Sequence, residues 1–226
     1  MIQQASNPYR LKTCQAQQFA TPVALLGYAS GGIFAGDFNG VIIRGWLDWR
    51  QQFEAKRITH GKHSTRLNPG YYANGVFRRC TRPAYEDAIT PVIPQSEALY
   101  KFGTASQILL QDLNAAVPAP YPWSVDVRQD FERTADPNKE HWHHDGISLL
   151  TVILTADGAG PLLSRGKNAT IHAMQSDLSI VATKETIKHN GEPAIPNWHR
   201  GPTLNENIAV NGNARRTNYV ARSEPL

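Results

Sequence analysis

Apolar residues in the second half of the chain form short runs of β-forming composition that are separated by turn residues. The separators are rich in Gly, Pro, Asn and Asp, as in segments 156–161 and 189–193. Many short strands with turns of this kind are typical of a β-sandwich or barrel. The predicted strands span residues 124–131, 147–155, 169–173, 178–183 and 215–222.

Before Trp123 the pattern indicates helices and loops. Apolar residues recur at helical spacing over residues 96–116, which predicts a long helix there. A shorter helix is expected over 46–56, after a turn and a short buried strand within 37–45. Residues 59–82 show no period, so we expect a long loop, and loops of this length often carry function.

These patterns predict a single domain over residues 1–226, of the α+β class and mainly β. A helical and loop layer, residues 1–122, is expected to pack on a β-sandwich core, residues 123–226. The composition, 41% hydrophobic and 19% charged, is that of a globular protein with a sizeable core.

The sequence gives no sign of a membrane or secreted protein. We find no apolar run of about 18 residues, so no membrane span is expected. The N-terminal segment lacks the basic and then apolar pattern of a secretory signal. Cys14 and Cys80 are the two cysteines, and they do not suggest a disulfide framework. A reducing cytoplasm is therefore the expected location.

Positive charge is unevenly distributed along a chain of formal net charge +4. Between Lys56 and Arg82 there are seven basic residues and no acidic one. Such a run attracts phosphates or carboxylates, although a solvated loop explains it more simply.

The segment His141-Trp142-His143-His144-Asp145-Gly146 contains a candidate metal site. His143 and Asp145 are two residues apart, so a strand would present both on one face. His199 follows 54 residues after Asp145 and would come from another strand folded against the first. Two imidazoles and one carboxylate on one face of a metal are the ligand set of non-haem Fe(II) oxygenases. We therefore predict His143, Asp145 and His199 as the metal ligands and the catalytic centre.

Other interpretations of this cluster are open at this point. The histidines could be the polar end of a strand, or the same donors with water could form a hydrolytic zinc site. The His-Glu-x-x-His helix motif that zinc hydrolases often carry is absent. His141 would share the face of His143 and could be a ligand or orient one, whereas His144 would face the other way.

The last predicted strand carries a row of polar and cationic residues. Arg216, Asn218 and Arg222 would share one face, and Arg215 would lie on the opposite face. Arginine binds a carboxylate through two parallel hydrogen bonds, so one of these arginines could fix a dicarboxylate cosubstrate.

Together, the His-x-Asp pair, the distal His199 and this strand resemble the Fe(II)/2-oxoglutarate-dependent oxygenase superfamily. Within it, Arg216-x-Asn218-x-Val220-x-Arg222 is similar to the Arg-x-Asn-x-Thr-x-Arg signature of the AlkB-like branch, with Val220 in place of the threonine. The resemblance covers roughly residues 124–223 and implies a double-stranded β-helix core of the jelly-roll, cupin-like type.

The resemblance also implies cofactors and chemistry. Fe(II) would be held by His143, Asp145 and His199, with 2-oxoglutarate and O2 as cosubstrates. Substrate hydroxylation would accompany formation of succinate and CO2. The cosubstrate would bind at Arg216, with Asn218 and Arg222 on the same face. If the strand register shifts by one residue, Arg215 with Thr217 takes this place.

The substrate is not named by any motif. The favoured hypothesis is a small metabolite, such as an amino acid or natural-product intermediate, with its anionic group held by basic residues of the 59–82 segment. The alternative is oxidative dealkylation of nucleic acid or nucleotide, with Tyr71, Tyr72 and Phe77 stacking on bases. A charge of +4 is modest for that role. A third hypothesis, a non-catalytic cupin-like binding domain, is disfavoured by the intact triad, and the oligomeric state stays open.

Overall fold

Two β-sheets form the framework of the computed structural model. The structure describes residues 10–49, 65–73, 76–79, 95–117, 122–130, 141–146, 148–166, 169–212 and 216–223. The larger sheet has the strand order β1-β2-β9-β6-β11-β5-β3-β4, and the smaller sheet has the order β10-β7-β8. Neighbouring strands are antiparallel, except that β1 and β2 are parallel.

The strand bounds, in the order of the larger sheet, are β1 (Leu11–Gln15), β2 (Gly40–Arg44), β9 (Leu178–Ala182), β6 (Leu150–Asp157), β11 (Arg216–Ser223), β5 (Trp123–Asp130), β3 (Thr65–Ala73) and β4 (Val76–Arg79). Those of the smaller sheet are β10 (His199–Arg200), β7 (Leu162–Gly166) and β8 (Ala169–His172).

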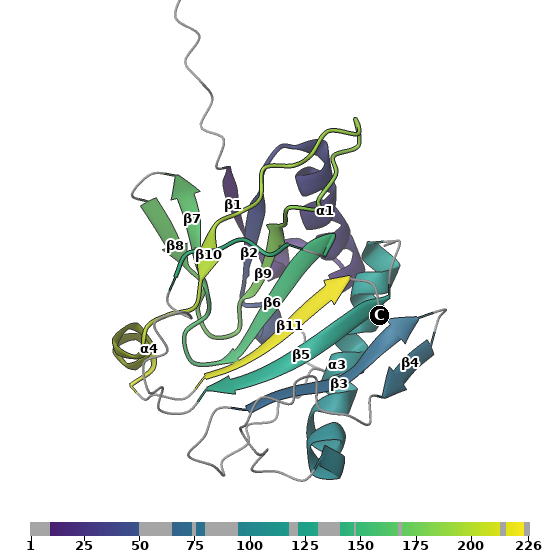
Figure 1. The fold of residues 1–226 in the computed structure, drawn as a ribbon, viewed down its shortest axis with the longest axis vertical. Helices are drawn as coiled ribbons and strands as arrows, with labels where there is room; N and C mark the ends of the chain where they lie inside the picture. The colour runs from purple at the N-terminus through teal and green to yellow at the C-terminus, as the bar shows by residue number, and fades with distance from the viewer. Residues whose placement is uncertain are drawn as a thin grey trace, which may run out of the picture.

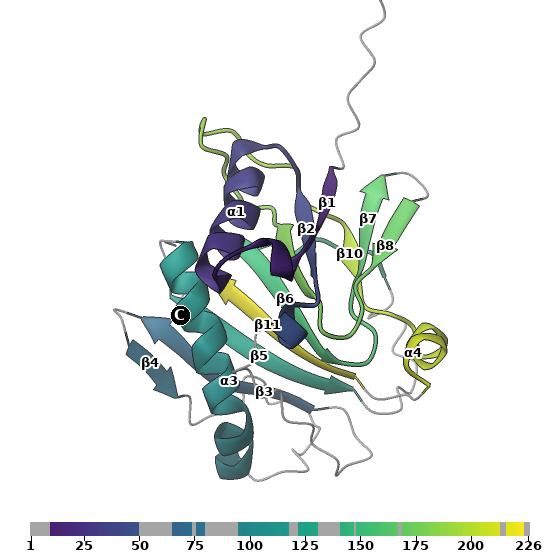
Figure 2. The same ribbon diagram turned by 180° about the vertical axis from the view of Figure 1, so that it is seen from behind.

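Helices α1 (Pro22–Ala35) and α3 (Gln95–Ala116) cover one face of the larger sheet (Figure 2). The smaller sheet lies on its other face (Figure 1). α1 begins where the Thr21 hydroxyl accepts a hydrogen bond from the Ala24 amide, and it ends at Gly36 in the left-handed conformation. The remaining helices are short: a 3₁₀ turn (Ala16–Gln18), α2 (Trp46–Trp49) and α4 (Leu204–Asn211). No helix in the described ranges is long and apolar enough to cross a bilayer.

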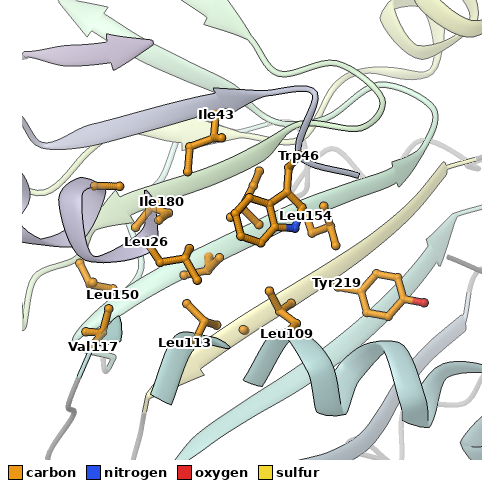
Figure 3. Close-up of a cluster of buried hydrophobic side chains, with 14 of the residues drawn as sticks. Leu26, Ile43, Trp46, Leu109, Leu113, Val117, Leu150, Leu154, Ile180 and Tyr219 are labelled. Carbon is orange, nitrogen blue, oxygen red and sulfur yellow. The ribbon is translucent and has the colours of Figure 1, made fainter. Parts of the chain in front are cut away.

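The main hydrophobic core fills the space between the larger sheet and the helices (Figure 3). Trp46, Trp123 and Tyr219 are its largest fully buried side chains, and α3 contributes Leu109 and Leu113. A second, smaller core lies between the two sheets and is formed by Ile42, Leu163, Ala173 and Val181. The helices therefore cover one face of the larger sheet. Its inner face, toward the smaller sheet, is covered in part and is the one available for a site.

All five strands expected in the second half of the chain are confirmed, as β5, β6, β8, β9 and β11, with bounds shifted by up to a few residues. The helix predicted over 96–116 is confirmed as α3. Of the helix predicted over 46–56, only α2 lies within the described residues.

The loop predicted over 59–82 is wrong where the structure describes it. β3 and β4 form an antiparallel pair there, and β3 pairs with β5. The register of β3 against β5 shifts between Leu67 and Gly70, at Asn68 and Pro69. This irregularity breaks the alternation that would reveal a strand. The first 122 residues thus supply four strands of the larger sheet in addition to helices.

Helix α1 was missed for a different reason. Its sequence is apolar or small on nearly every side, so it has no polar stripe and no amphipathic period. It packs against both α3 and β9, and the residues on its exposed side, among them Val23 and Tyr28, are apolar or aromatic rather than charged.

Candidate metal centre

His143 and His199 lie directly opposite each other in a short antiparallel ladder. The His143 amide donates to the His199 carbonyl at 2.9 Å, and the His199 amide donates to the His143 carbonyl at 2.8 Å. Directly opposed residues project their side chains on the same face, and the two imidazole centroids are 4.6 Å apart. The ladder extends the smaller sheet at β10, so the expected second strand for His199 is confirmed.

Asp145 completes a cluster of three potential ligand atoms that lie within 4.8 Å of one another. Its Oδ2 is 3.5 Å from His199 Nε2, and its carbonyl accepts from the Lys184 amide at 3.1 Å. Two ligands that each lie about 2.1 Å from a metal, at right angles, are about 3 Å apart. The cluster is therefore close to the size that one metal ion requires.

The hydrogen bonds of the three side chains also leave atoms that can bind a metal. His143 Nδ1 is 3.0 Å from the His141 carbonyl, and His199 Nδ1 is 3.3 Å from the Asn197 carbonyl. A ring nitrogen that donates to a carbonyl leaves the other nitrogen as the acceptor for a metal. Asp145 Oδ2 is buried and has no hydrogen-bond donor within the described residues, so its lone pairs are available as well.

An arginine from β11 holds the carboxylate from the other side. Arg222 Nη2 is 3.6 Å from Asp145 Oδ1, and Arg222 Nη1 is 3.5 Å from Asp126 Oδ2 on the neighbouring strand β5. Burial alone would raise the pKa of Asp145, but interactions with His199 and the Arg222 guanidinium outweigh it. The pKa of Asp145 is thus far below its usual range, and the carboxyl is ionised as a metal ligand must be.

Burial also lowers the pKa of His143, which favours the neutral imidazole that binds metals. The charges of His199 and Arg128 lower it further, whereas the His141 carbonyl and Asp145 oppose the shift. In the folded chain His199 is buried and His143 is exposed, so the cluster opens toward solvent on the His143 side.

Strand β11 presents its predicted polar row to this inner face. Tyr219 and Ala221 belong to the core under the helices, so Asn218, Val220 and Arg222 point the opposite way. Arg216 is buried, and its Nη1 would lie 3.0 Å from a Cβ placed on Gly201, two residues after His199. A glycine at 201 therefore leaves room for the Arg216 guanidinium beside the ligand strand.

Two buried polar atoms lie side by side on this face. Asn218 pairs with Thr155 of β6, and neither Asn218 Oδ1 nor Thr155 Oγ1 has a hydrogen-bond partner among the described residues. Buried polar groups are normally satisfied, so this row can accept a polar ligand. Arg215, the alternative to Arg216, lies outside the described residues.

His141 and His144, the other two histidines of this segment, do not place their side chains in the cluster. His144 faces the outer side, as expected, and its ring contacts that of Trp198 at a tilt of 49°, with ring centroids 4.6 Å apart. His141 is exposed and contributes its carbonyl to His143. The strand expected to carry both His143 and Asp145 is reduced to the bridge at His143, and β6 starts only at Leu150.

Asp126 and Arg128 were missed by the sequence reasoning. Both lie on β5, facing the site, and their carboxylate and guanidinium groups are 3.8 Å apart. The signal was present as the alternation Ser124-Val125-Asp126-Val127-Arg128, in which both valines point into the main core.

Comparison with known proteins identifies the fold. Neither a protein-family model nor a curated protein matches the sequence. Among solved structures, a Caulobacter crescentus protein whose name places it in the 2OG-Fe(II) oxygenase family matches with a TM-score of 0.50 and 10% identity, over 94% of this chain and 85% of that chain. This chain has the 2OG-Fe(II) oxygenase fold. The predicted double-stranded β-helix, mainly β with added helices, is confirmed.

Two further structures are similar at lower scores. The Arabidopsis thaliana dioxygenase for auxin oxidation 1, in a complex with 2-oxoglutarate, gives 0.47 and 10% identity, over 96% of this chain and 93% of that one. A full-length Neurospora crassa protein, in complex with alpha-KG and thymine, gives 0.46 and 10% identity, over 97% and 87%.

Proposed function

We propose that this protein is an Fe(II)- and 2-oxoglutarate-dependent dioxygenase that hydroxylates a small metabolite and forms succinate and CO2. The observation that carries the proposal is the cluster of His143, Asp145 and His199 at the inner face of the fold, beside a row of arginines. A zinc hydrolase needs no such cations, whereas a dicarboxylate cosubstrate does.

His143, Asp145 and His199 would hold Fe(II) and leave coordination positions open, and the bound iron would supply oxygen activation coupled to decarboxylation of 2-oxoglutarate. The protein fixes these ligands through the backbone ladder between His143 and His199 and through the Arg222 contact to Asp145. Arg222 orients the carboxylate by holding Oδ1, which leaves the buried Oδ2 for the metal.

Arg216 would bind the distal carboxylate of 2-oxoglutarate. Its guanidinium is buried beside Gly201, close to the strand that carries His199. The Asn218 side chain lies one step along the same face and would hydrogen-bond the cosubstrate through its amide. A small-molecule substrate is favoured over nucleic acid because the net charge of +4 is modest.

The metal site is tested with anaerobically purified protein. The wild-type chain should bind one Fe(II) and, once O2 is admitted, produce succinate from 2-oxoglutarate, and His199→Ala or Asp145→Ala should abolish both. His144→Ala is the matched control, because His144 neighbours the ligands in sequence but stacks on Trp198 on the outer side. Unchanged iron stoichiometry in His199→Ala would contradict the assignment.

A further inference from the structure

Asn197 lies where the chain passes from the larger sheet to the smaller one, two residues before the candidate ligand His199. Its backbone amide donates to the carbonyl of Ala182, the last residue of β9, at 3.0 Å. The next carbonyl along the chain, that of Trp198, accepts from the Ser164 amide of β7 at 2.8 Å. Asn197 therefore sits at a junction of the two sheets, on the approach to the ligand.

The Asn197 side chain is fully buried and ties this junction to two further segments. Its Nδ2 donates to Asn39 Oδ1, just ahead of β2, and to the Ser164 carbonyl on β7, both at 3.2 Å. A primary amide has two N–H groups, so both are used. The Ser164 carbonyl can only accept, which fixes the nitrogen on that side. Gly40 leaves room for the amide, because a Cβ there would lie 3.2 Å from Nδ2.

The backbone carbonyl of the same residue faces the ligand. His199 Nδ1 is 3.3 Å from the Asn197 carbonyl, which can accept a hydrogen bond only when Nδ1 carries the proton. That tautomer leaves Nε2, which is 3.5 Å from Asp145 Oδ2, free to bind a metal. The carbonyl belongs to the residue whose side-chain amide is bonded at two points. The direction of the imidazole is thus coupled to the buried amide.

Stability alone does not account for this amide. Asn197 Oδ1 and Asn39 Nδ2 are buried and have no hydrogen-bond partner among the described residues. Leaving a buried polar atom unpaired costs at least as much as a hydrogen bond contributes on balance. The two hydrogen bonds of the Asn197 amide are therefore offset by the two unpaired atoms. What the amide still provides is a fixed position for the carbonyl beside His199.

We propose that Asn197 is a positioning residue for the metal site, because its buried amide fixes the backbone carbonyl that orients the His199 imidazole. The inference rests on the proposed function, in which His199 is a metal ligand, and names what holds that ligand in place. His143 does not share this support, since its Nδ1 faces the carbonyl of the exposed His141. Loss of the Asn197 amide should disturb one imidazole of the pair and leave the other unchanged.

The first test observes the two imidazoles separately. The protein is loaded with Zn(II), a diamagnetic ion that accepts imidazole and carboxylate ligands. The ring ¹⁵N shifts of labelled histidine are measured through the carbon-bound ring protons, and they report which nitrogen carries the proton and which binds the metal. In the wild type both rings should carry the proton on Nδ1. In Asn197→Ala the shifts of His199 should move and broaden, whereas those of His143 should stay at their wild-type values.

The second test measures the Fe(II) affinity of the folded protein by anaerobic competition with a chelating dye. Asn197→Ala and Asn197→Leu should bind Fe(II) about 10- to 100-fold more weakly, the usual effect of removing a group that orients a metal ligand. Leucine is close to asparagine in volume and uncharged but donates no hydrogen bond, so it separates hydrogen bonding from packing. Asn39→Ala removes one of the two anchors and should weaken binding by less. It decides the question if the Asn197 variants do not fold.

Asn207→Ala is the matched control. Asn207 is also a buried asparagine that holds a distant backbone group, the Ala159 amide at 2.8 Å, but it lies on α4, outside the ladder between His143 and His199. Its loss should lower the free energy of unfolding in urea and leave the Fe(II) affinity within about twofold of wild type.

Three outcomes overturn the proposal: wild-type iron affinity in the Asn197 variants that fold, or in Asn39→Ala if none of them does; equal changes in the ring shifts of His143 and His199; or an equal loss of affinity in Asn207→Ala. A wild-type protein that binds neither Zn(II) nor Fe(II) would instead be a failure of the proposed function, recognisable before any variant is compared.

Discussion

Strand β11 faces two different environments. The contrast between them distinguishes residues that stabilise the fold from residues that can bind ligands. On one side, Tyr219 (Figure 3) is fully buried in the core beneath the helices. Ala221 is buried in the same core. On the other side, Asn218 and Arg222 face the candidate metal centre. The same alternation continues on β5, where Val125 and Val127 are opposed to Asp126 and Arg128. The apolar face can hold the sheet together, while the polar face is left to bind ligands.

The polar face is costly for the fold. Asn218 Oδ1, Thr155 Oγ1, Ser179 Oγ and Asp145 Oδ2 are buried there without hydrogen-bond partners among the described residues. Each such group typically costs about 1–3 kcal/mol of folding free energy. The apolar face offsets that cost. A bound metal would supply the partner that Asp145 Oδ2 lacks, and a dicarboxylate would accept hydrogen bonds from hydroxyls such as those of Thr155 and Ser179. Stability and ligand binding should therefore respond to different substitutions.

The largest effect is expected from the polar face, in Arg216→Ala. Removing one partner of a buried charge pair costs about 3–5 kcal/mol, so the affinity for 2-oxoglutarate should fall by roughly two to four decades. Binding is measured by calorimetry with the metal-loaded protein. Arg215→Ala is the matched control and should change the affinity much less. A large effect only at Arg215 would move the cosubstrate to the opposite face of the strand.

The apolar face is tested by Leu113→Ala in α3. Leu113 is fully buried in the main core, and a Leu→Ala change at such a position lowers the free energy of unfolding by about 2–5 kcal/mol. Urea denaturation gives this difference, while iron bound per folded molecule should stay at the wild-type value. Ile208→Ala, at an exposed position of α4, should alter stability by no more than about 0.5 kcal/mol. If Leu113→Ala lowers the iron stoichiometry of the folded protein, the two faces are not independent.

Most strands that form the apolar face could be predicted from the sequence. So could the three candidate metal ligands at the centre of the polar face. Short β-forming runs located β5, β6, β8, β9 and β11. For β5, β6, β9 and β11 the reason is that strands buried on one or both faces keep their branched apolar residues. The His143 and Asp145 pair and His199 could be recognised because metal ligands must be specific residue types at a workable spacing.

The features that could not be predicted from the sequence depend mostly on pairing between strands that are far apart in the chain. Asp126 and Arg128 gain their meaning only when β5 pairs with β11, more than 80 residues later, so that Asp126 meets Arg222. The β3–β4 pair was hidden in the same way, since its place beside β5 comes from sheet registry rather than from local alternation. Helix α1 was hidden because its exposed side also carries apolar residues, such as Val23 and Tyr28, which leaves no amphipathic period.

A smaller effect, on the unfolding free energy, is expected from a change at the N-terminus of α4, the helix that follows the ligand strand β10 in the chain. The Thr203 hydroxyl accepts from the Glu206 amide at 3.1 Å, and the Glu206 carboxylate accepts from the Thr203 amide at 2.7 Å. This reciprocal cap follows directly after Gly201 and Pro202, next to the Arg216 guanidinium. Thr203→Ala should cost about 0.5–2 kcal/mol of unfolding free energy, measured by urea denaturation, and Thr203→Ser should retain most of it. An equal loss in Thr203→Ser would mean that the methyl group, not the cap, matters.

The smallest effect is a pH dependence of the unfolding free energy, and it arises on the outer side of the ladder between His143 and His199. There Arg200 lies over the Trp142 ring and binds Glu206 through two contacts of 2.7 Å. The hydrogen bond from Arg200 is the largest cause that lowers the pKa of Glu206, to about 2. Because the folded-state pKa is depressed, the ionised carboxylate stabilises the fold above its ordinary pKa of 4.5, and this contribution is lost as the pH falls toward 2. The carboxylate is about one-third exposed, so the contribution should stay under about 1 kcal/mol.

Glu206→Gln isolates this contribution. The difference in unfolding free energy between wild type and variant should be constant near neutral pH and shrink between about pH 4.5 and 2, measured by urea denaturation at each pH. High salt should reduce this difference in unfolding free energy at neutral pH, because dissolved ions screen the attraction between Arg200 and the partly exposed Glu206 carboxylate. Because Glu206 touches the outer side and not the metal cluster, iron stoichiometry should not change in the variant. A difference that persists unchanged at pH 2 would show that Glu206 acts through its neutral hydrogen bonds to the cap, and that charge on the outer side does not support the ligand strand.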